Sequence, residues 1–120
     1  MAPLRLLLVE DDALVRRSLC RWLNAEGFEV SSAVDGQEAL AVLRSTGDIA
    51  CVISDISMPH LDGEQLARAL SEHYPELPLV LVSGDRAPRS GILTQGKRAF
   101  VPKPLSRRAL AEAIAQVLSS

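Results

Sequence analysis

The segment Leu4-Arg5-Leu6-Leu7-Leu8-Val9-Glu10-Asp11-Asp12 gives the strongest indication of the fold, because an apolar run there meets three consecutive acidic residues. A run that is apolar at consecutive positions, rather than at alternate ones, is typical of a strand buried on both faces of a parallel sheet. The acids that follow mark the end of that strand, and Asp12 is placed to cap a helix. The sequence therefore predicts a strand over Leu4–Val9 that leads directly into a helix.

The same alternation of short apolar runs and amphipathic stretches continues along the chain. The later predicted strands cover Phe28–Val34, Ile49–Ser54, Leu77–Ser83 and Ala99–Val101. Four predicted helices follow caps at Asp12, Asp35, Asp62 and Ser106. The first helix runs through about Glu26 and ends at Gly27, and the second runs to Leu43, with Glu38 completing a capping box. The third covers about Gly63–His73, and the last has Leu110, Ile114 and Leu118 on one face. This order predicts an α/β fold, a doubly wound five-stranded parallel sheet with helices on both faces.

A fourth helix is predicted less strongly, between the fourth and fifth strands. The segment Arg86–Lys97 contains Pro88, Gly91 and Gly96, and glycine costs about 1 kcal/mol inside a helix. We therefore expect only a short helix there, over roughly Pro88–Gln95.

Composition favours one globular domain over residues 1–120. The 48% of hydrophobic residues is enough for a core, and the formal net charge of -2 gives no reason to expect direct nucleic-acid binding. No apolar run approaches the roughly 20 residues of a membrane helix, so no membrane association and a cytoplasmic location are expected. Cys20 and Cys51 lack metal-ligand spacing and are expected to be free, buried thiols.

Polar residues lie at or just after the ends of four of the predicted strands. Glu10 and Asp11 follow the first strand, Asp55 the third, and Lys103 the fifth, while Ser83 ends the fourth. The carboxyl ends of parallel strands share one edge of the sheet, where the functional crevice of such folds lies. Three carboxylates there repel one another, and a hard cation such as Mg²⁺ relieves the repulsion. One carboxylate is then free to act as a nucleophile on phosphorus.

Four segments together resemble the receiver domain of two-component response regulators, the CheY-like family. They are Leu6–Asp12, Val52–Pro59 leading to Leu61-Asp62-Gly63, Leu81–Gly84, and Phe100–Pro104. The resemblance covers essentially the whole chain. It implies a flavodoxin-like fold with strand order 2-1-3-4-5, which would place Glu10 and Asp11 beside Asp55.

The resemblance also implies a role for each matching residue. Asp55 corresponds to the phosphoacceptor, and Mg²⁺ would be held by Glu10, Asp11, Asp55 and the backbone carbonyl of Ser57. Ser83 and Lys103 would contact the phosphoryl group, with Ser83 and Phe100 forming the conformational switch. Two residues, Ser57 and Asp85, would influence the lifetime of the phospho-form, and the peptide bond before Pro104 is often cis in the family.

The function expected from these roles is phosphoryl transfer from a phosphohistidine to Asp55, in a switch rather than a turnover enzyme. The expected donor is a histidine kinase or a histidine phosphotransfer protein. An output domain, an effector protein or a second copy, bound through the face formed by the fourth helix, fifth strand and last helix, would read the signal. The sequence leaves open whether the chain is a stand-alone regulator or part of a hybrid kinase or larger regulator.

Three other functions are compatible with parts of the sequence. A receiver-like interaction module that accepts no phosphate is disfavoured by the intact acidic residues. A haloacid-dehalogenase-like hydrolase needs a second Asp two residues after the nucleophile, where this chain has Ser57. An FMN-binding flavodoxin needs a Ser/Thr-rich loop after the first strand, which is absent from this sequence.

Overall fold

The computed structural model describes residues 3–56, 63–83, 97–103 and 105–119. Within these ranges the elements are, in chain order, β1 (Arg5–Val9), α1 (Ala13–Ala25), β2 (Glu29–Ala33), α2 (Gly36–Ser45), β3 (Ile49–Asp55), α3 (Gly63–His73), β4 (Leu79–Ser83), β5 (Arg98–Pro102) and α4 (Arg107–Leu118). All strand pairs are parallel, in the order β2-β1-β3-β4-β5. The predicted architecture and strand order are confirmed.

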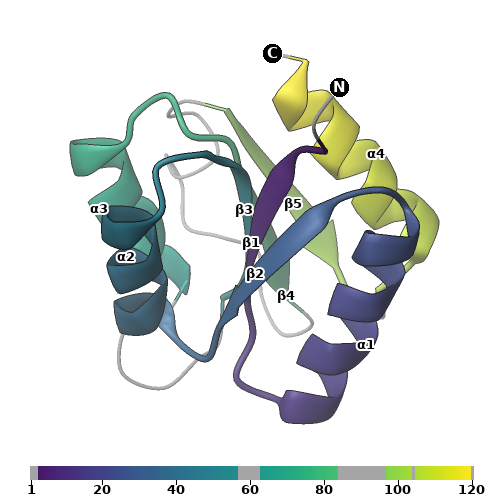
Figure 1. The fold of residues 1–120 in the computed structure, drawn as a ribbon. Coiled ribbons are helices and arrows are strands. Elements are labelled where there is room, and N and C mark those ends of the chain that lie inside the picture. The colour runs from purple at the N-terminus through teal and green to yellow at the C-terminus, as the bar shows by residue number, and fades with distance from the viewer. Residues whose placement is uncertain (1–2, 57–62, 84–96, 104, 120) are drawn as a thin grey trace.

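Two helical layers enclose the sheet (Figure 1). Helices α2 and α3 cover one face, and α1 and α4 cover the other. Side chains of β1 alternate between the two cores, since Leu7 and Val9 pack toward α2 and α3 while Leu6 and Leu8 pack toward α1 and α4. Burial on both faces explains why the strand reads as one continuous apolar run.

Helix starts follow the capping chemistry that the sequence predicts. Asp12 accepts hydrogen bonds from the backbone N–H groups of Leu14 and Val15, and Asp35 accepts one from Glu38. Ser106 accepts one from Ala109 at the start of α4. At the end of α1, Gly27 has a φ of 100°, a left-handed conformation that glycine adopts without steric cost.

Differences from the predicted boundaries are small, and most shorten a strand. The predicted strands over Phe28–Val34 and Leu77–Ser83 begin one and two residues later in the structure, as β2 and β4. Strand β5 is longer than predicted and begins at Arg98, which is buried. The predicted cap Asp62 and the short helix over Pro88–Gln95 lie outside the described residues.

Both cysteines are free thiols. Cys51 is fully buried in β3, as expected, while Cys20 on α1 is only partly buried. The described helices include none that is long and apolar enough to cross a membrane.

Candidate functional site

Two acidic residues lie buried side by side at the carboxyl edge of the sheet. Glu10 follows β1 and is 5% exposed, and Asp55 ends β3 and is 8% exposed. Their strands are parallel neighbours, with Val9 paired to Ser54, so the two carboxylates emerge at the same level. Burying an ionised carboxylate is costly unless it is paired, so this arrangement calls for a nearby positive charge.

Lys103 supplies that charge. Its Nζ lies 2.7 Å from Oδ2 of Asp55, in an ion pair between residues that follow or end different strands. The backbone N–H of Lys103 donates to the carbonyl of Ser83 at 2.9 Å, which fixes where the lysine leaves the sheet. The hydrogen bond to Asp55 raises the pKa of Lys103, so the side chain is an ammonium ion at neutral pH.

Glu10 remains incompletely compensated. Burial raises its pKa to about 7, the carboxyls of Asp11 and Asp55 add to the rise, and the Asp12 N–H and the charge of Lys103 oppose it. The Asp12 N–H donates to Oε2 of Glu10 at 3.0 Å. A carboxyl whose pKa rises because of burial and neighbouring acids is in an environment that favours an added cation.

The donor set suits Mg²⁺, but the side chains are turned to other partners. Carboxylate oxygens from Glu10, Asp11 and Asp55 are the hard ligands that Mg²⁺ prefers. Among the described residues, however, no three acidic, histidine or cysteine side chains are grouped closely enough to hold a metal together. Glu10 is bonded to the Asp12 amide and Asp55 to Lys103, which accounts for their separate orientations. Mg²⁺ therefore stays a prediction.

A small cavity of about 210 Å³ lies beside the buried acids. Its polar lining comes from Glu10, Asp55 and Lys103. The remaining lining residues are apolar and come from the strands, from α1 and from the residue before the cap of α4: Leu8, Val9, Val15, Leu19, Ile53, Val82 and Leu105. The carboxylates thus stand at the end of an apolar space, where charge interactions are stronger than in water.

The predicted switch residues are placed by β4 and β5. Ser83 ends β4 and is buried, at the same sheet edge as Asp55. Phe100 is partly buried and packs against the core between the sheet and helices α2 and α3. Ser57, Asp85 and Pro104 lie outside the described residues.

Sequence reasoning missed Arg16. Its Nη1 donates to the carbonyl of Glu10 at 2.9 Å and lies 3.4 Å from that of Asp11. The spacing of four residues after the cap Asp12 offered one clue, since the first turn of a helix faces the loop that precedes it. No periodic pattern marks such a contact.

The sequence and the fold resemble those of known proteins. A family model described as the response regulator receiver domain matches residues 6–115. This chain belongs to the response regulator receiver domain family. Receiver domains are signalling switches in two-component systems, rather than classical enzymes, and the chain has their five-stranded sheet.

Individual relatives of this receiver domain include regulators and a kinase. It is 41% identical over 106 residues to the response regulator MprA of Mycolicibacterium vanbaalenii, a match covering 87% of this chain and 46% of the relative. It is 36% identical over 115 residues to the sensor kinase CckA of Brucella abortus, covering 93% of this chain and 12% of the relative. The receiver domain therefore spans less than half the length of these two relatives.

Solved structures of response regulators have a similar fold. The chemotaxis protein CheY4 of Vibrio cholerae superposes with a TM-score of 0.86 at 26% identity, covering 98% of this chain and 100% of that one. The response regulator StyR superposes with a TM-score of 0.87 at 29% identity, covering 98% of this chain and 60% of that one.

Proposed function

We propose that Asp55 accepts a phosphoryl group from a phosphohistidine on a histidine kinase or a histidine phosphotransfer protein, with Mg²⁺ present. The observation that carries the proposal is the buried carboxylate of Asp55, held 2.7 Å from the ammonium of Lys103 and beside Glu10. A structural ion pair needs no additional buried acid, whereas a phosphoryl-transfer site needs a nucleophile, a cationic partner and metal ligands together.

The transfer follows from these positions. An oxygen of Asp55 attacks phosphorus, the P–N bond to the donor imidazole breaks, and its electron pair stays on the imidazole nitrogen, which takes up a proton. An acyl phosphate forms on Asp55, and water later hydrolyses it. Lys103 stabilises negative charge on the phosphoryl oxygens. Mg²⁺, when bound through Glu10, Asp11, Asp55 and the Ser57 carbonyl, would supply further charge neutralisation.

A groove beside the site suits the phosphodonor. It lies between α1 and α4, is about 370 Å³ in volume, and shares Val15, Leu19 and Leu105 with the cavity at Asp55. Leu14 on its rim is 74% exposed, an unusual position for a large apolar side chain. The groove therefore offers an apolar surface that leads to the nucleophile.

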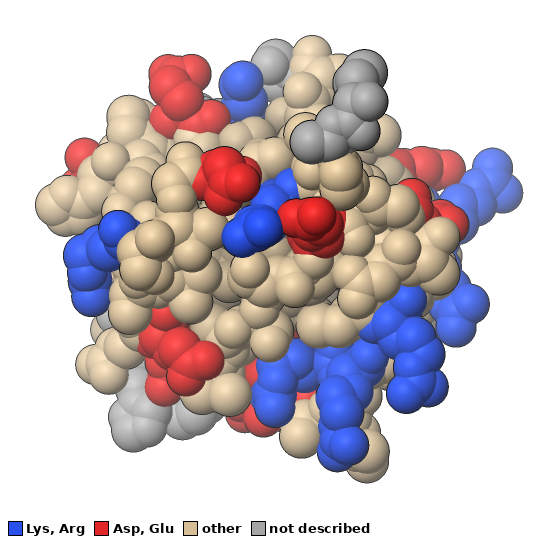
Figure 2. Space-filling view, in the orientation of Figure 1, with Lys and Arg blue, Asp and Glu red and all other residues tan. Residues whose placement is uncertain are grey.

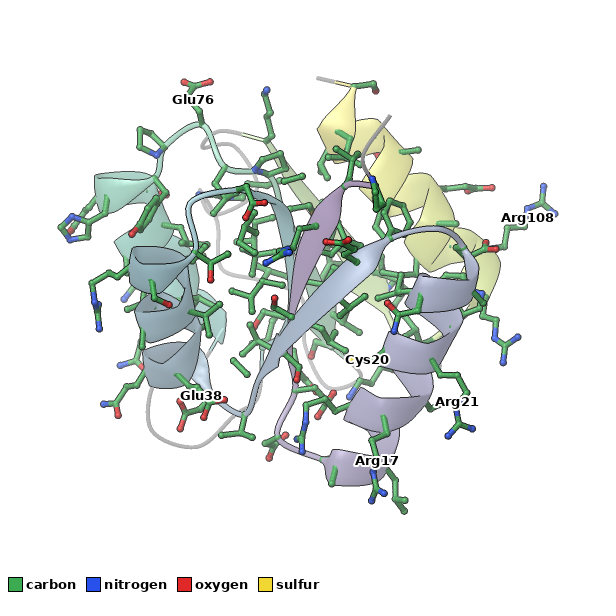
Figure 3. The ribbon with its side chains drawn as sticks, in the orientation of Figure 1. Arg17, Cys20, Arg21, Glu38, Glu76 and Arg108 are labelled. Atoms are coloured by element: carbon green, nitrogen blue, oxygen red, sulfur yellow. The ribbon has the colours of Figure 1, made fainter. Side chains whose placement is uncertain are left out.

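The charge around this groove favours an acidic donor surface. Figure 2 shows Lys and Arg side chains gathered over α1, a helix whose thirteen residues include three arginines and no acid. Figure 3 shows Arg21 projecting outward from α1, and Arg107 of α4 lines the groove itself. We propose that the donor docks here through a helix with apolar residues flanked by Asp or Glu.

The signal would then pass to the rest of the domain. A phosphoryl group adds roughly -1.5 to -2 charge at neutral pH, and Ser83 and Phe100 are proposed to respond to it. Ser57 and Asp85 are proposed to set the lifetime of the phospho-form. The partner that binds the phosphorylated domain is proposed to be an output domain, an effector protein or a second copy of the chain. The proposed location is the cytoplasm.

Acetyl phosphate tests the function without a protein donor. Wild-type protein is expected to gain one phosphoryl group, seen by intact-protein mass spectrometry, only when Mg²⁺ is added. Asp55→Asn and Asp55→Ala should abolish the gain. The matched control is Asp48→Asn, which removes an exposed carboxylate next to β3 and should label like wild type.

Two results would count against the proposed function. Absence of labelling in wild type would favour an interaction module that accepts no phosphate. Turnover of small phosphate esters would favour a hydrolase instead.

A further inference from the structure

Arg16 is bound to the backbone of the acidic loop rather than to its carboxylates. The residue lies in the first turns of α1, and its Nη1 donates to the Glu10 carbonyl at 2.9 Å, with the Asp11 carbonyl at 3.4 Å. The neighbouring Arg17 is exposed, and its Nε lies 3.4 Å from the carbonyl of Ala13 in its own helix. Figure 3 shows Arg17 pointing away from the sheet. Two adjacent arginines therefore have entirely different surroundings.

The loop from Glu10 to Asp12 is held by several backbone contacts, and Arg16 completes them. The Glu10 N–H donates to the carbonyl of Ala33 at 3.0 Å, and the Asp12 N–H donates to the Glu10 side chain at 3.0 Å. Asp12 caps α1, and its carbonyl accepts from the Arg16 N–H at 2.9 Å. The Arg16 side chain then binds two successive carbonyls, which restricts the rotation of the peptide groups on either side of Asp11.

This arrangement matters most for Asp11, which is exposed and is not held by surrounding packing. Its side-chain direction depends on the backbone that carries it. Because the two bonds of Arg16 go to carbonyl oxygens, the guanidinium fixes the loop without occupying carboxylate oxygens that a cation would need. Its positive charge also lies on the helix side of the two acids.

We infer that Arg16 is a positioning residue, which holds the backbone of Glu10 and Asp11 so that only their side chains, and not the loop that carries them, need to move when they bind a divalent cation. The inference rests on the proposed function, since it assumes that the cation is Mg²⁺ at this site. Removal of Arg16 should weaken Mg²⁺ binding by roughly 10- to 100-fold, the effect typical of groups that orient metal ligands.

The test compares Arg16→Met with Arg17→Met in the full chain. Mg²⁺ affinity is measured by titration followed by backbone amide NMR shifts, and exchange of the Asp12 N–H with solvent is measured in metal-free protein. Arg16→Met should weaken Mg²⁺ binding and accelerate that exchange, and Arg16→Lys should restore part of both. Saturating Mg²⁺ should restore labelling of Arg16→Met by acetyl phosphate. Arg17→Met should match wild type throughout.

Unchanged Mg²⁺ affinity in Arg16→Met, or equal weakening in Arg17→Met, would overturn the inference. Amide exchange separates this failure from failure of the proposed function. If wild type binds no Mg²⁺, the proposed function fails, while faster Asp12 exchange in Arg16→Met would still support the loop-holding role. If exchange is also unchanged, the positioning role fails on its own account.

Discussion

Nζ of Lys103 lies 2.7 Å from Oδ2 of Asp55, although the two residues are 48 positions apart in the sequence. Asp55 ends β3 and Lys103 follows β5, and β4 lies between these two strands, so the long lysine side chain reaches across one strand of the sheet edge. The Asp55 side chain is 9% exposed and that of Lys103 is 38% exposed, so the pair is screened from solvent on the aspartate side. The lysine that compensates the resting carboxylate therefore lies where the proposed phosphoryl group would be attached.

The first prediction concerns the loss of this ammonium group. Lys103→Met should slow phosphorylation by acetyl phosphate by about 100-fold at saturating Mg²⁺, since one donor to a developing charge typically contributes 100- to 1,000-fold. Lys97→Met is the control, because Lys97 precedes β5 at the opposite end of the strand. The measurement is the initial labelling rate by mass spectrometry. Equal rates for Lys103→Met and wild type would show that Asp55 needs no cationic side chain.

The second prediction concerns stability at the other end of β5. Arg98 is 7% exposed; its Nη1 donates to the Leu77 carbonyl at 3.1 Å and its Nη2 to Oγ of Ser71 at 3.0 Å. Its Nε is buried without a hydrogen-bond partner, and burial lowers the pKa of the guanidinium. Arg98→Ala should lower the free energy of unfolding by roughly 1–3 kcal/mol, because it leaves the Leu77 carbonyl without this donor.

Urea unfolding of three variants checks that explanation. Arg98→Met should cost less than Arg98→Ala, since it fills the space and removes a buried charge that lacks an acidic partner among the described residues. Ser71→Ala should cost about 1 kcal/mol, the value of one hydrogen bond. If Arg98→Met were as destabilised as Arg98→Ala, the guanidinium contacts rather than the packing of the side chain would be the stabilising feature.

The third prediction concerns thiol reactivity. Burial raises the pKa of Cys51 to about 12, and the side chain is fully enclosed in β3. At pH 8 the thiolate fraction is therefore on the order of 1 in 10⁴, and only the thiolate is the nucleophile. Burial also raises the pKa of Cys20, but its side chain is only partly enclosed.

Alkylation followed by mass spectrometry distinguishes the two thiols. In folded protein at pH 8, Cys20 should react first and Cys51 only in urea, while Cys20→Ala should remain unlabelled until it unfolds. Rapid labelling of Cys51 in folded Cys20→Ala would contradict the burial of β3.

Much of the fold was predictable because it depends on local chemistry and apolar pattern. The caps at Asp12, Asp35 and Ser106 mark helix starts through side-chain hydrogen bonds, and the helix over Gly63–His73 has the predicted bounds. The site was predictable only as a set of residues at one sheet edge, because strand order brings Glu10, Asp55 and Lys103 together. That order came from the family resemblance rather than from the residues alone.

The parts that sequence did not predict involve long basic side chains. The predicted strand Ala99–Val101 leaves out Arg98, whereas β5 begins at Arg98 and the residue is buried. Its burial depends on Ser71 and Leu77, which lie 27 and 21 positions away. Arg16 likewise binds carbonyls, and every residue has one, so the sequence carries no sign of which carbonyls are chosen.

The fourth prediction concerns the groove between α1 and α4, the proposed docking surface for the phosphodonor. Arg21→Glu with Arg107→Glu should slow phosphoryl transfer from the cognate kinase on the order of tenfold at low salt, because charges at the rim of an interface mainly change the association rate. Arg107 begins α4, where an acidic residue is favoured by the helix dipole, so the fold should tolerate the change. Arg44→Glu on α2, across the sheet from this groove, is the control. Labelling by acetyl phosphate should be unaffected in all variants, and the difference between them should shrink as salt rises. A loss of transfer that persists at high salt, or one shared by Arg44→Glu, would place the donor elsewhere.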